Sequence, residues 1–385
     1  MKLFNSLSLL TKRSEHMTEF EKNFNERVIG ILEETRATNL QEFRKNAQRF
    51  IDELRLHSFS DENGYKFITI MKLSHILRKS PPDVVEMLPL SMVMALIKMT
   101  AYNGAIDILL IDELVKTYVH CETIYIKLLP YAENNKEISS YELQQFITAC
   151  YVPLMKNKPE NVEYYAAYIV GIIFFIVDSR RKEFALIQDI LTSTLLFHLE
   201  TCIQFDNGVL QIEPHINFFS IKCFQSALHE FRSLDVDRNG VLSQSEMLVF
   251  RYSFFNQVFI KRVFEISQTY EGGFLDFKGF VDLITAIHFR HTKASAKYHF
   301  EAFDLKNDGY LDEEEIRELC LVLHECIPAE EAVPDADVLT VELMDMIKCK
   351  DRISLDEFLA SKMRTTFTGF ISNYQDWYKY ERREQ

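Results

Sequence analysis

Residues 235–246 read Asp235-Val-Asp-Arg-Asn-Gly-Val-Leu-Ser-Gln-Ser-Glu246 and match the EF-hand calcium loop from its first position to its twelfth, which predicts a helix–loop–helix fold. Gly240 stands at position 6, where the chain must turn sharply. Oxygen ligands stand at positions 1, 3, 5, 7, 9 and 12, the seventh being a backbone carbonyl. They are Asp235, Asp237, Asn239, Val241, Ser243 and Glu246. We call residues 235–246 the first loop, and it predicts a calcium site.

Helical patterns flank the first loop on both sides. Apolar residues from Phe224 to Phe231 recur on one helix face before it, and the apolar run Met247–Phe250 follows it. Leu242, at position 8, is expected to pair with the loop of a neighbouring hand. These flanks favour an EF-hand over the alternative, an acidic turn between two ordinary helices.

A second loop, residues 304–315, carries a defect. Its sequence is Asp304-Leu-Lys-Asn-Asp-Gly-Tyr-Leu-Asp-Glu-Glu-Glu315, with acids at positions 1, 5, 9 and 12. Position 3 is Lys306, whose ammonium cannot coordinate a cation and repels it. A helix–loop–helix is therefore expected here, while calcium binding is left open.

Four further segments keep parts of the pattern. Residues 178–189 keep acids at both ends, and residues 268–279 keep Gly273 and Leu275. Residues 99–110 and 131–142 keep still less, so an ordinary helix–loop–helix describes those two equally well. We interpret the set as structural hands that fold without metal and hold partners or neighbouring hands.

Composition supports an all-α chain of tandem helix–loop–helix units. The 385 residues include only 11 Gly and 9 Pro, which favours helices over a turn-rich β architecture, and the length suggests two or three packed units. A formal charge of −14 argues against nucleic-acid binding and fits metal loops or a basic partner. Seven Cys without a C-x-x-C pair are typical of reduced cytosolic thiols.

No membrane or targeting segment is predicted. The most apolar stretch, Tyr164 to Val177, is shorter than the roughly 20 residues of a span and is expected to be a buried core helix. Residues 18–56 suggest two amphipathic helices packed on the body, although a solvated arm describes the first of them equally well. Breakers divide the chain into expected domains at 1–60, 61–160, 161–210, 211–325 and 326–385.

Catalytic motifs are missing from the sequence. There is no phosphate-binding loop, nucleophile elbow or zinc helix. His288 and His291 lack a third metal ligand and are interpreted as ordinary histidines. The aromatic tail around Trp377, Tyr378 and Tyr380 is expected to pack in the core rather than to anchor a partner. The chain is therefore predicted not to be an enzyme.

The order of several short segments resembles the B-double-prime family of protein phosphatase 2A regulatory proteins. Its gamma branch is indicated by Ile187-Gln-Asp-Ile-Leu191, Ile353-Ser-Leu355 and Tyr380-Glu-Arg-Arg-Glu384. The family segments are Asn217-Phe-Phe-Ser, Phe259-Ile-Lys-Arg-Val-Phe-Glu265, Leu275-Asp-Phe-Lys-Gly-Phe-Val281, Tyr298-His-Phe-Glu-Ala-Phe-Asp-Leu and Asn307-Asp-Gly-Tyr-Leu311.

This resemblance implies a non-catalytic regulatory subunit, which would bind the scaffold and catalytic subunits of the phosphatase. The gamma branch implies centrosomal or microtubule-associated partners, and a location in the cytoplasm, at centrosomes and on the spindle. The family's calcium ligands carry over to the six residues of the first loop. In the second loop they carry over to Asp304, Asp308, Tyr310, Asp312 and Glu315, with Lys306 placing that site in question.

Two other readings compete with a phosphatase regulatory subunit. A stand-alone EF-hand sensor or centrosomal adaptor would be expected to have several intact loops. A calcium-regulated enzyme would need catalytic residues, which the sequence does not show. The regulatory subunit ranks first.

Overall fold

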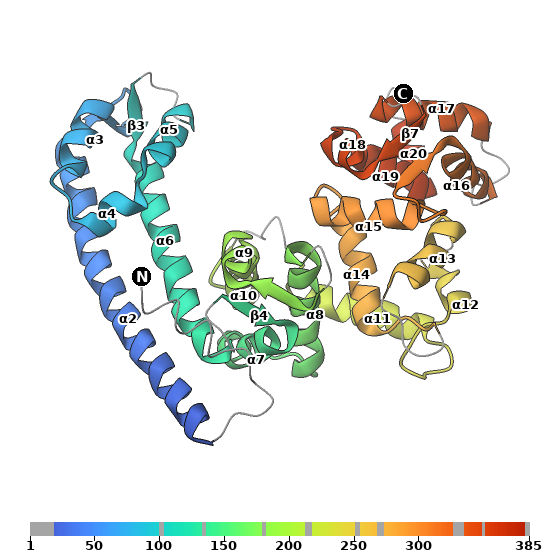
Figure 1. Cartoon of the computed structure of the whole chain (residues 1–385), viewed down its shortest axis with the longest axis horizontal. Helices are drawn as coiled ribbons and strands as arrows, with labels where there is room; N and C mark the ends of the chain where they lie inside the picture. The colour runs from blue at the N-terminus through green and yellow to red at the C-terminus, as the bar shows by residue number, and fades with distance from the viewer. Residues whose placement is uncertain are drawn as a thin grey trace. The chain divides into compact units, whose positions relative to one another are not determined.

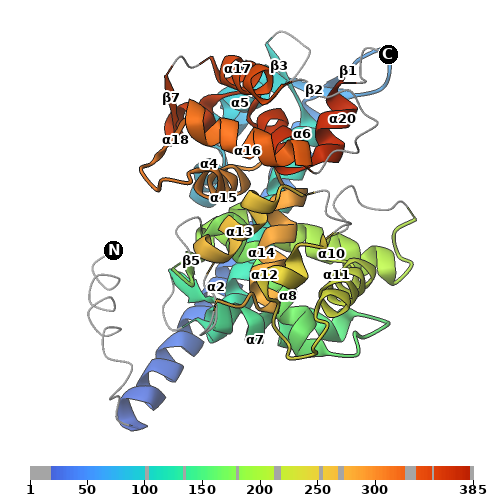
Figure 2. The same ribbon diagram turned by 90° about the vertical axis from the view of Figure 1, so that its right-hand side faces the viewer.

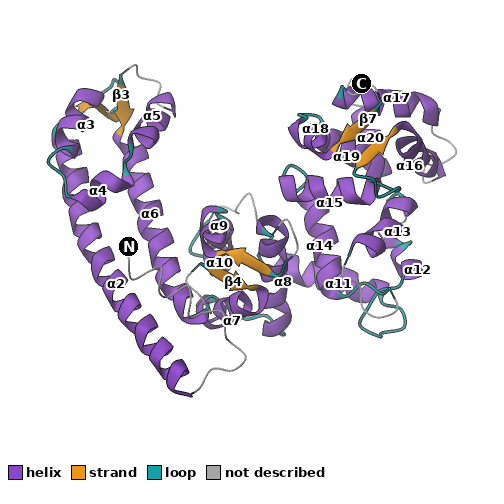
Figure 3. Ribbon diagram, viewed as in Figure 1, coloured by secondary structure: helices purple, strands orange, loops and turns teal. Residues whose placement is uncertain are grey.

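The computed structural model describes residues 19–99, 104–132, 136–178, 182–211, 218–250, 255–267, 273–325, 335–348 and 351–381. Helices dominate these ranges, and the strands have only two to four residues each (Figure 1, Figure 3). The predicted all-α class is thus confirmed. Within these ranges, no helix has the length and apolar character needed to cross a bilayer.

The chain forms two compact units. One comprises residues 1–138 with 186–192, and the other comprises residues 139–185 with 193–385. The five domains expected from the sequence remain a prediction.

The first unit is built on one long helix where the sequence predicted two. Helix α2 (Glu19–Leu56) is continuous, because Gly30 is its sole glycine, proline is absent from it, and a single glycine is tolerated inside a helix. It packs along α6 (Ile108–Leu128), as Figure 1 shows, and Phe43 meets Tyr118 with 4.8 Å between ring centroids. From Leu40 onwards its apolar face is part of the core, as expected for the second of the two predicted helices. The choice between a packed helix and a solvated arm concerned the first of them and is not settled by this packing.

The rest of the first unit contains two loops that pair with each other. Strand β2 (Lys66–Thr69) lies antiparallel to β3 (Ala105–Asp107), with Ile68 opposite Ile106. The loop that begins at Asp61 is a hand that the sequence analysis missed. The remaining elements of this unit are β1 (Phe59–Ser60), α3 (Ile70–Leu77), α4 (Pro82–Met87), α5 (Leu90–Met99), η2 (Leu129–Tyr131) and α9 (Ile187–Thr192).

The second unit is organised around α8 (Val162–Val177). Nine of its residues from Tyr165 to Phe174 are buried, which confirms the predicted core helix. It lies against α14 (Phe277–His288) and α15 (Lys293–Phe303); Figure 2 shows α8 beside α14. The other helices are α7 (Ser140–Cys150), η3 (Val152–Leu154), α10 (Leu195–Asp206), α11 (Ile221–Leu234), α12 (Gln244–Met247), α13 (Gln257–Ile266), α16 (Glu313–Glu325), α17 (Ala336–Ile347), α18 (Leu355–Ala360), α19 (Arg364–Ser372) and α20 (Tyr374–Glu381).

Loops of neighbouring hands pair through the apolar residue at position 8. Leu242 bridges Leu275, as expected from the sequence, and Leu311 of β6 (Tyr310–Asp312) faces Ile353 of β7 (Arg352–Ser354). All four side chains are fully buried. Strands β4 (Glu137–Ser139) and β5 (Phe184–Leu186) form a further two-stranded sheet. A hand without metal ligands thus keeps its structural role by supplying one apolar residue and two backbone hydrogen bonds.

The tail and the two histidines have ordinary packing roles. Trp377 is buried and contacts Phe370 edge-on, in agreement with the predicted core role; the side chain of Tyr380 lies outside the described part. His288 packs on Phe218 and His291 packs on Phe289, and both histidines are exposed. The pair therefore does not form a shared polar site.

Candidate metal centre

Helix α11 delivers the start of the first loop. Ser220 caps the helix by accepting a hydrogen bond from the Cys223 amide at 3.2 Å. Phe224, Phe231 and Leu234 are buried, which fixes the rotation of the helix and so the position of Asp235 at its end. At Gly240 the backbone has φ +84°, a left-handed conformation that glycine adopts without strain.

Two residues have two roles each at the end of the first loop. Ser243 and Glu246 form a capping box that begins α12: the Glu246 amide donates to Ser243 Oγ at 3.3 Å, and the Ser243 amide donates to Glu246 Oε2 at 2.8 Å. They are also loop positions 9 and 12. The apolar run Met247–Phe250 suggested a longer exit helix, but α12 ends at Met247.

Three carboxylates converge in the first loop. Asp235, Asp237 and Glu246 each offer an oxygen, and these oxygens lie within 4.8 Å of one another. Within the described ranges, no other group of three His, Cys, Asp or Glu side chains meets the same criterion. Such a convergence of like charges is unfavourable unless amides or a cation compensate for it.

Backbone amides hold these carboxylates in place. Asp235 accepts from the amides of Asn239 and Gly240, both at 3.0 Å, and Glu246 accepts from the Val236 amide at 2.9 Å. Burial raises the pKa of Glu246, but its hydrogen bonds with Ser243 and with the Val236 and Asp237 amides outweigh burial and lower it. The carboxylate is therefore ionised at neutral pH.

The first loop fits calcium chemically. Its side chains present hard oxygen donors with three negative charges, and position 3 carries no cation. Of the remaining predicted ligands, the Asn239 side-chain amide donates through Nδ2 to Asp237 at 2.9 Å, and the Ser243 hydroxyl donates to Glu246 at 2.7 Å. The predicted polar ligands thus form one connected network.

The second loop has the same backbone framework. Asp304 accepts from the amides of Asp308 at 3.1 Å and Gly309 at 2.8 Å. Glu315, which is buried, accepts from the amides of Lys306 at 2.9 Å and Asp312 at 3.0 Å. These contacts reproduce those of Asp235 and Glu246 in the first loop.

A protein cation pairs with two carboxylates at one side of the second loop. Lys306 Nζ forms ion pairs with Asp312 and, at 2.9 Å, with Glu314. These hydrogen bonds, first that with Asp312, raise the pKa of Lys306, so the ammonium stays charged. Position 3 of the second loop offers no oxygen ligand, because it is occupied by the positively charged side chain of Lys306. The second loop therefore does not fit calcium as the first does.

Arg262 is a structural residue that sequence reasoning missed. It reaches from α13 and donates through Nη2 to the Asp304 carbonyl and to Asn307 Oδ1, both at 2.7 Å. Its side chain is almost fully buried. Because 42 residues separate it from Asp304, no short motif could have indicated the contact.

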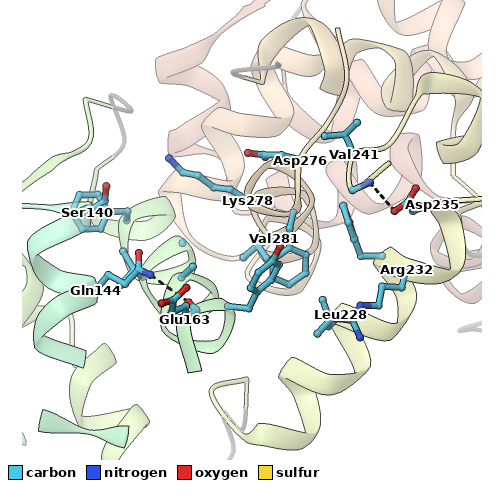
Figure 4. Close-up of a pocket in the computed structure, with 18 of the residues that line it drawn as sticks. Ser140, Gln144, Glu163, Leu228, Arg232, Asp235, Val241, Asp276, Lys278 and Val281 are labelled. Carbon is cyan, nitrogen blue, oxygen red and sulfur yellow. Dashed lines mark hydrogen bonds between the residues drawn. The ribbon is translucent and has the colours of Figure 1, made fainter. Parts of the chain in front are cut away.

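A hollow of about 880 Å³ lies beside the first loop, between α7, α8, α11 and α14 (Figure 4). Asp235 and Val241 lie in its wall, and Glu163, Asp276 and Lys278 supply polar groups around it. Its apolar lining comes from Tyr164, Ala167, Val170, Phe174, Leu228, Phe231, Phe277 and Val281. Rearrangement of the first loop would therefore change the shape of this surface.

Comparison with known proteins identifies the class. Three family models match in order along the chain: the RSA-1 N-terminal domain at residues 17–122, the RSA-1 middle domain at 133–220 and the RSA-1 C-terminal domain at 235–385. A solved chain from a phosphatase 2A PR70 holoenzyme superposes with a TM-score of 0.50 and 20% identity, covering 63% of this chain and 92% of that one. That likeness supports the EF-hand helical fold.

Curated relatives carry the family assignment. The chain is 46% identical to the serine/threonine-protein phosphatase 2A regulatory subunit rsa-1 of Caenorhabditis elegans, over 98% of this chain and 95% of that protein. It is 27% identical to the human B-double-prime gamma regulatory protein of phosphatase 2A, over 70% of this chain and 60% of that protein. The chain belongs to the RSA-1 family of phosphatase 2A regulatory subunits, which are non-catalytic. The relation to the B-double-prime gamma branch inferred from short segments is confirmed.

Proposed function

We propose that this chain binds the scaffold and catalytic subunits of phosphatase 2A and directs the enzyme to substrates at centrosomes and on spindle microtubules. The observation that carries the proposal is the 46% identity to the nematode regulatory subunit across nearly the full length of both chains. The assignment to centrosomes and spindle rests on the resemblance to the gamma branch, by analogy.

Calcium binding at the first loop is the second part of the proposal. Asp235, Asp237 and Glu246 would hold the ion with charged oxygens. Asn239, Ser243 and the Val241 carbonyl would complete the shell. The bound cation would offset the repulsion among the three carboxylates. The chain's own amides already orient Asp235 and Glu246, so little reorganisation of those two side chains is required.

The paired hands suggest how such a protein recruits partners. Hands that need no metal provide fixed helix pairs, and the hollow beside the first loop provides a surface of mixed apolar and polar side chains on which an amphipathic helix would dock. The contact of Asp235 and Val241 with this surface would make partner binding respond to calcium.

Purification and imaging from dividing cells test the targeting part. A tagged full-length chain is expected to co-purify with the scaffold and catalytic subunits and to concentrate at spindle poles. Diffuse signal throughout mitosis, with the phosphatase still co-purifying, would refute the targeting while leaving the assignment as a regulatory subunit intact.

A further inference from the structure

The first and second loops share their backbone contacts, but the second loop contains a lysine where the first contains a predicted calcium-ligating aspartate. Their first and last acids accept matching backbone amides: Asp235 and Asp304 at position 1, Glu246 and Glu315 at position 12. The second loop is thus folded as a complete hand. At position 3, Asp237 contributes a carboxylate to the first loop and Lys306 contributes an ammonium to the second. Positions 5 and 9 are neutral in the first loop and acidic in the second.

The Lys306 ammonium contacts the carboxylates on the far side of its own loop. Nζ reaches Asp312 at position 9 and Glu314 at position 11. In the first loop, position 9 is Ser243, which carries no charge to neutralise. The second loop carries six acids where the first carries three, and Lys306 pairs with two of these six, Asp312 and Glu314.

A second cationic side chain, Arg262 of α13, donates hydrogen bonds to the second loop. Arg262 Nη2 donates to the Asp304 carbonyl and to Asn307, and also to the Glu301 carbonyl at 3.2 Å. Asn307 has φ +54°, a left-handed conformation that Asn adopts more readily than most residues, and Arg238 at the same position of the first loop has φ +59°. Arg262 thus holds the second loop by hydrogen bonds that need no metal.

We propose that Lys306, supported by Arg262, takes the place of calcium in the second loop, so that this hand keeps its closed form without metal. Lys306 is then the specificity-determining residue that confines calcium to the first loop. This inference deepens the calcium proposal above, and its test can fail separately from it.

Calcium stoichiometry tests the inference in the full-length chain. Isothermal titration is expected to give one calcium for wild type, none for Glu246→Gln, and two for Lys306→Asp, which restores an oxygen at position 3. The double variant Glu246→Gln with Lys306→Asp is expected to bind one. Lys158→Asp, with the same charge change in an exposed segment outside the hands, is the matched control and should bind one.

Terbium luminescence locates the new site. Tyr310 is at position 7 of the second loop, whereas the first loop has Val241 there. Tyrosine-excited terbium emission is expected to rise several-fold in Lys306→Asp, and adding Tyr310→Phe should abolish the rise. Should Lys306→Asp not fold, Lys306→Asn introduces the oxygen with a smaller charge change, and the same two-calcium result is expected.

Two outcomes would overturn the inference. One is a wild-type chain whose second calcium survives Glu246→Gln and is lost when Glu315→Gln is added. The other is folded Lys306→Asp and Lys306→Asn proteins that bind no more metal than wild type. If instead wild type binds none and Lys306→Asp binds one, the first-loop assignment fails while the role of Lys306 is supported.

Discussion

Leu242 and Leu275 exchange two backbone hydrogen bonds, of 2.7 and 2.8 Å, and both side chains are fully buried. Leu242 belongs to the first loop, and Leu275 belongs to a loop without anchoring acids. The candidate calcium site is therefore joined directly to a metal-free hand. From that hand, α13 carries Arg262 to the second loop. The four loops of this half of the chain thus form one connected structure.

Replacing the last ligand of the first loop is expected to remove calcium binding without unfolding the chain. Glu246→Gln deletes the bidentate anchor but keeps the buried faces of α11 and α14. Affinity should fall at least about tenfold, equivalent to about 1.4 kcal/mol or more. Titration calorimetry measures the loss, and Glu357→Gln, at the capping box of α18, is a control that should bind normally. A normal isotherm for Glu246→Gln would show the ligand assignment to be wrong.

Truncating the bridge residue is expected to destabilise the second unit. Leu242→Ala removes a fully buried side chain and should cost about 2–5 kcal/mol. Trp377, the sole tryptophan, is buried in the same unit, so urea denaturation can be followed by its fluorescence. Val249→Ala, at an exposed position, should change stability by no more than about 0.5 kcal/mol. Equal effects of the two substitutions would contradict the role of the pairing.

Acid is expected to destabilise the second unit through His299. Burial, aided by Arg290 and opposed by a hydrogen bond to Ser295, lowers its pKa from 6.5 to about 3. Between these values the unfolded chain binds a proton that the folded chain does not. Stability is therefore complete above pH 6.5 and falls as the pH decreases, by about 2 kcal/mol at pH 5.

Denaturation at pH 7 and pH 5 measures that dependence. His299→Leu should flatten it, whereas His291→Gln, at an exposed histidine, should leave it as in wild type. An unchanged pH dependence in His299→Leu would assign the acid sensitivity to other groups.

Removing Arg262 is expected to loosen the second loop. Arg262→Met leaves the Asp304 carbonyl and Asn307 without their donor and should cost roughly 3 kcal/mol. Arg262→Lys should recover less than half, because the guanidinium pairs with Glu265 through Nη1 and with the loop through Nη2, and one ammonium cannot reproduce both. Lys261→Met, at the exposed neighbouring position, is the control. Full rescue by lysine would mean that charge alone matters.

Much of the fold could be predicted because EF-hands carry their own spacing. The turn at Gly240, the acids around it and the apolar position 8 are all local in sequence, so the loop, its flanking helices and its pairing were foreseeable. The hand at 61–72 was missed because Lys72 stands at position 12 and no anchoring acid is there. Ile68 and the capping residue Thr69 were the remaining signals.

Contacts distant in sequence could not be predicted. The packing of α13 and α14 against α15 brings Arg262 to the second loop, and this packing has no short sequence signal. Likewise, position 3 indicated that Lys306 disfavours calcium, but only the structure places its ammonium on Asp312. The continuous α2 was also unforeseen, because charge and apolar residues alternate along it without marking whether the helix breaks.

Size-exclusion chromatography with purified phosphatase 2A scaffold and catalytic subunits measures whether this chain is a regulatory subunit of the phosphatase. The full-length chain is expected to co-elute with both subunits as a heterotrimer in calcium. A repeat in chelator then separates a calcium-gated chain, which would elute alone, from one whose metal only modulates binding. Failure to co-elute in either condition would contradict the account and favour a stand-alone calcium-binding adaptor.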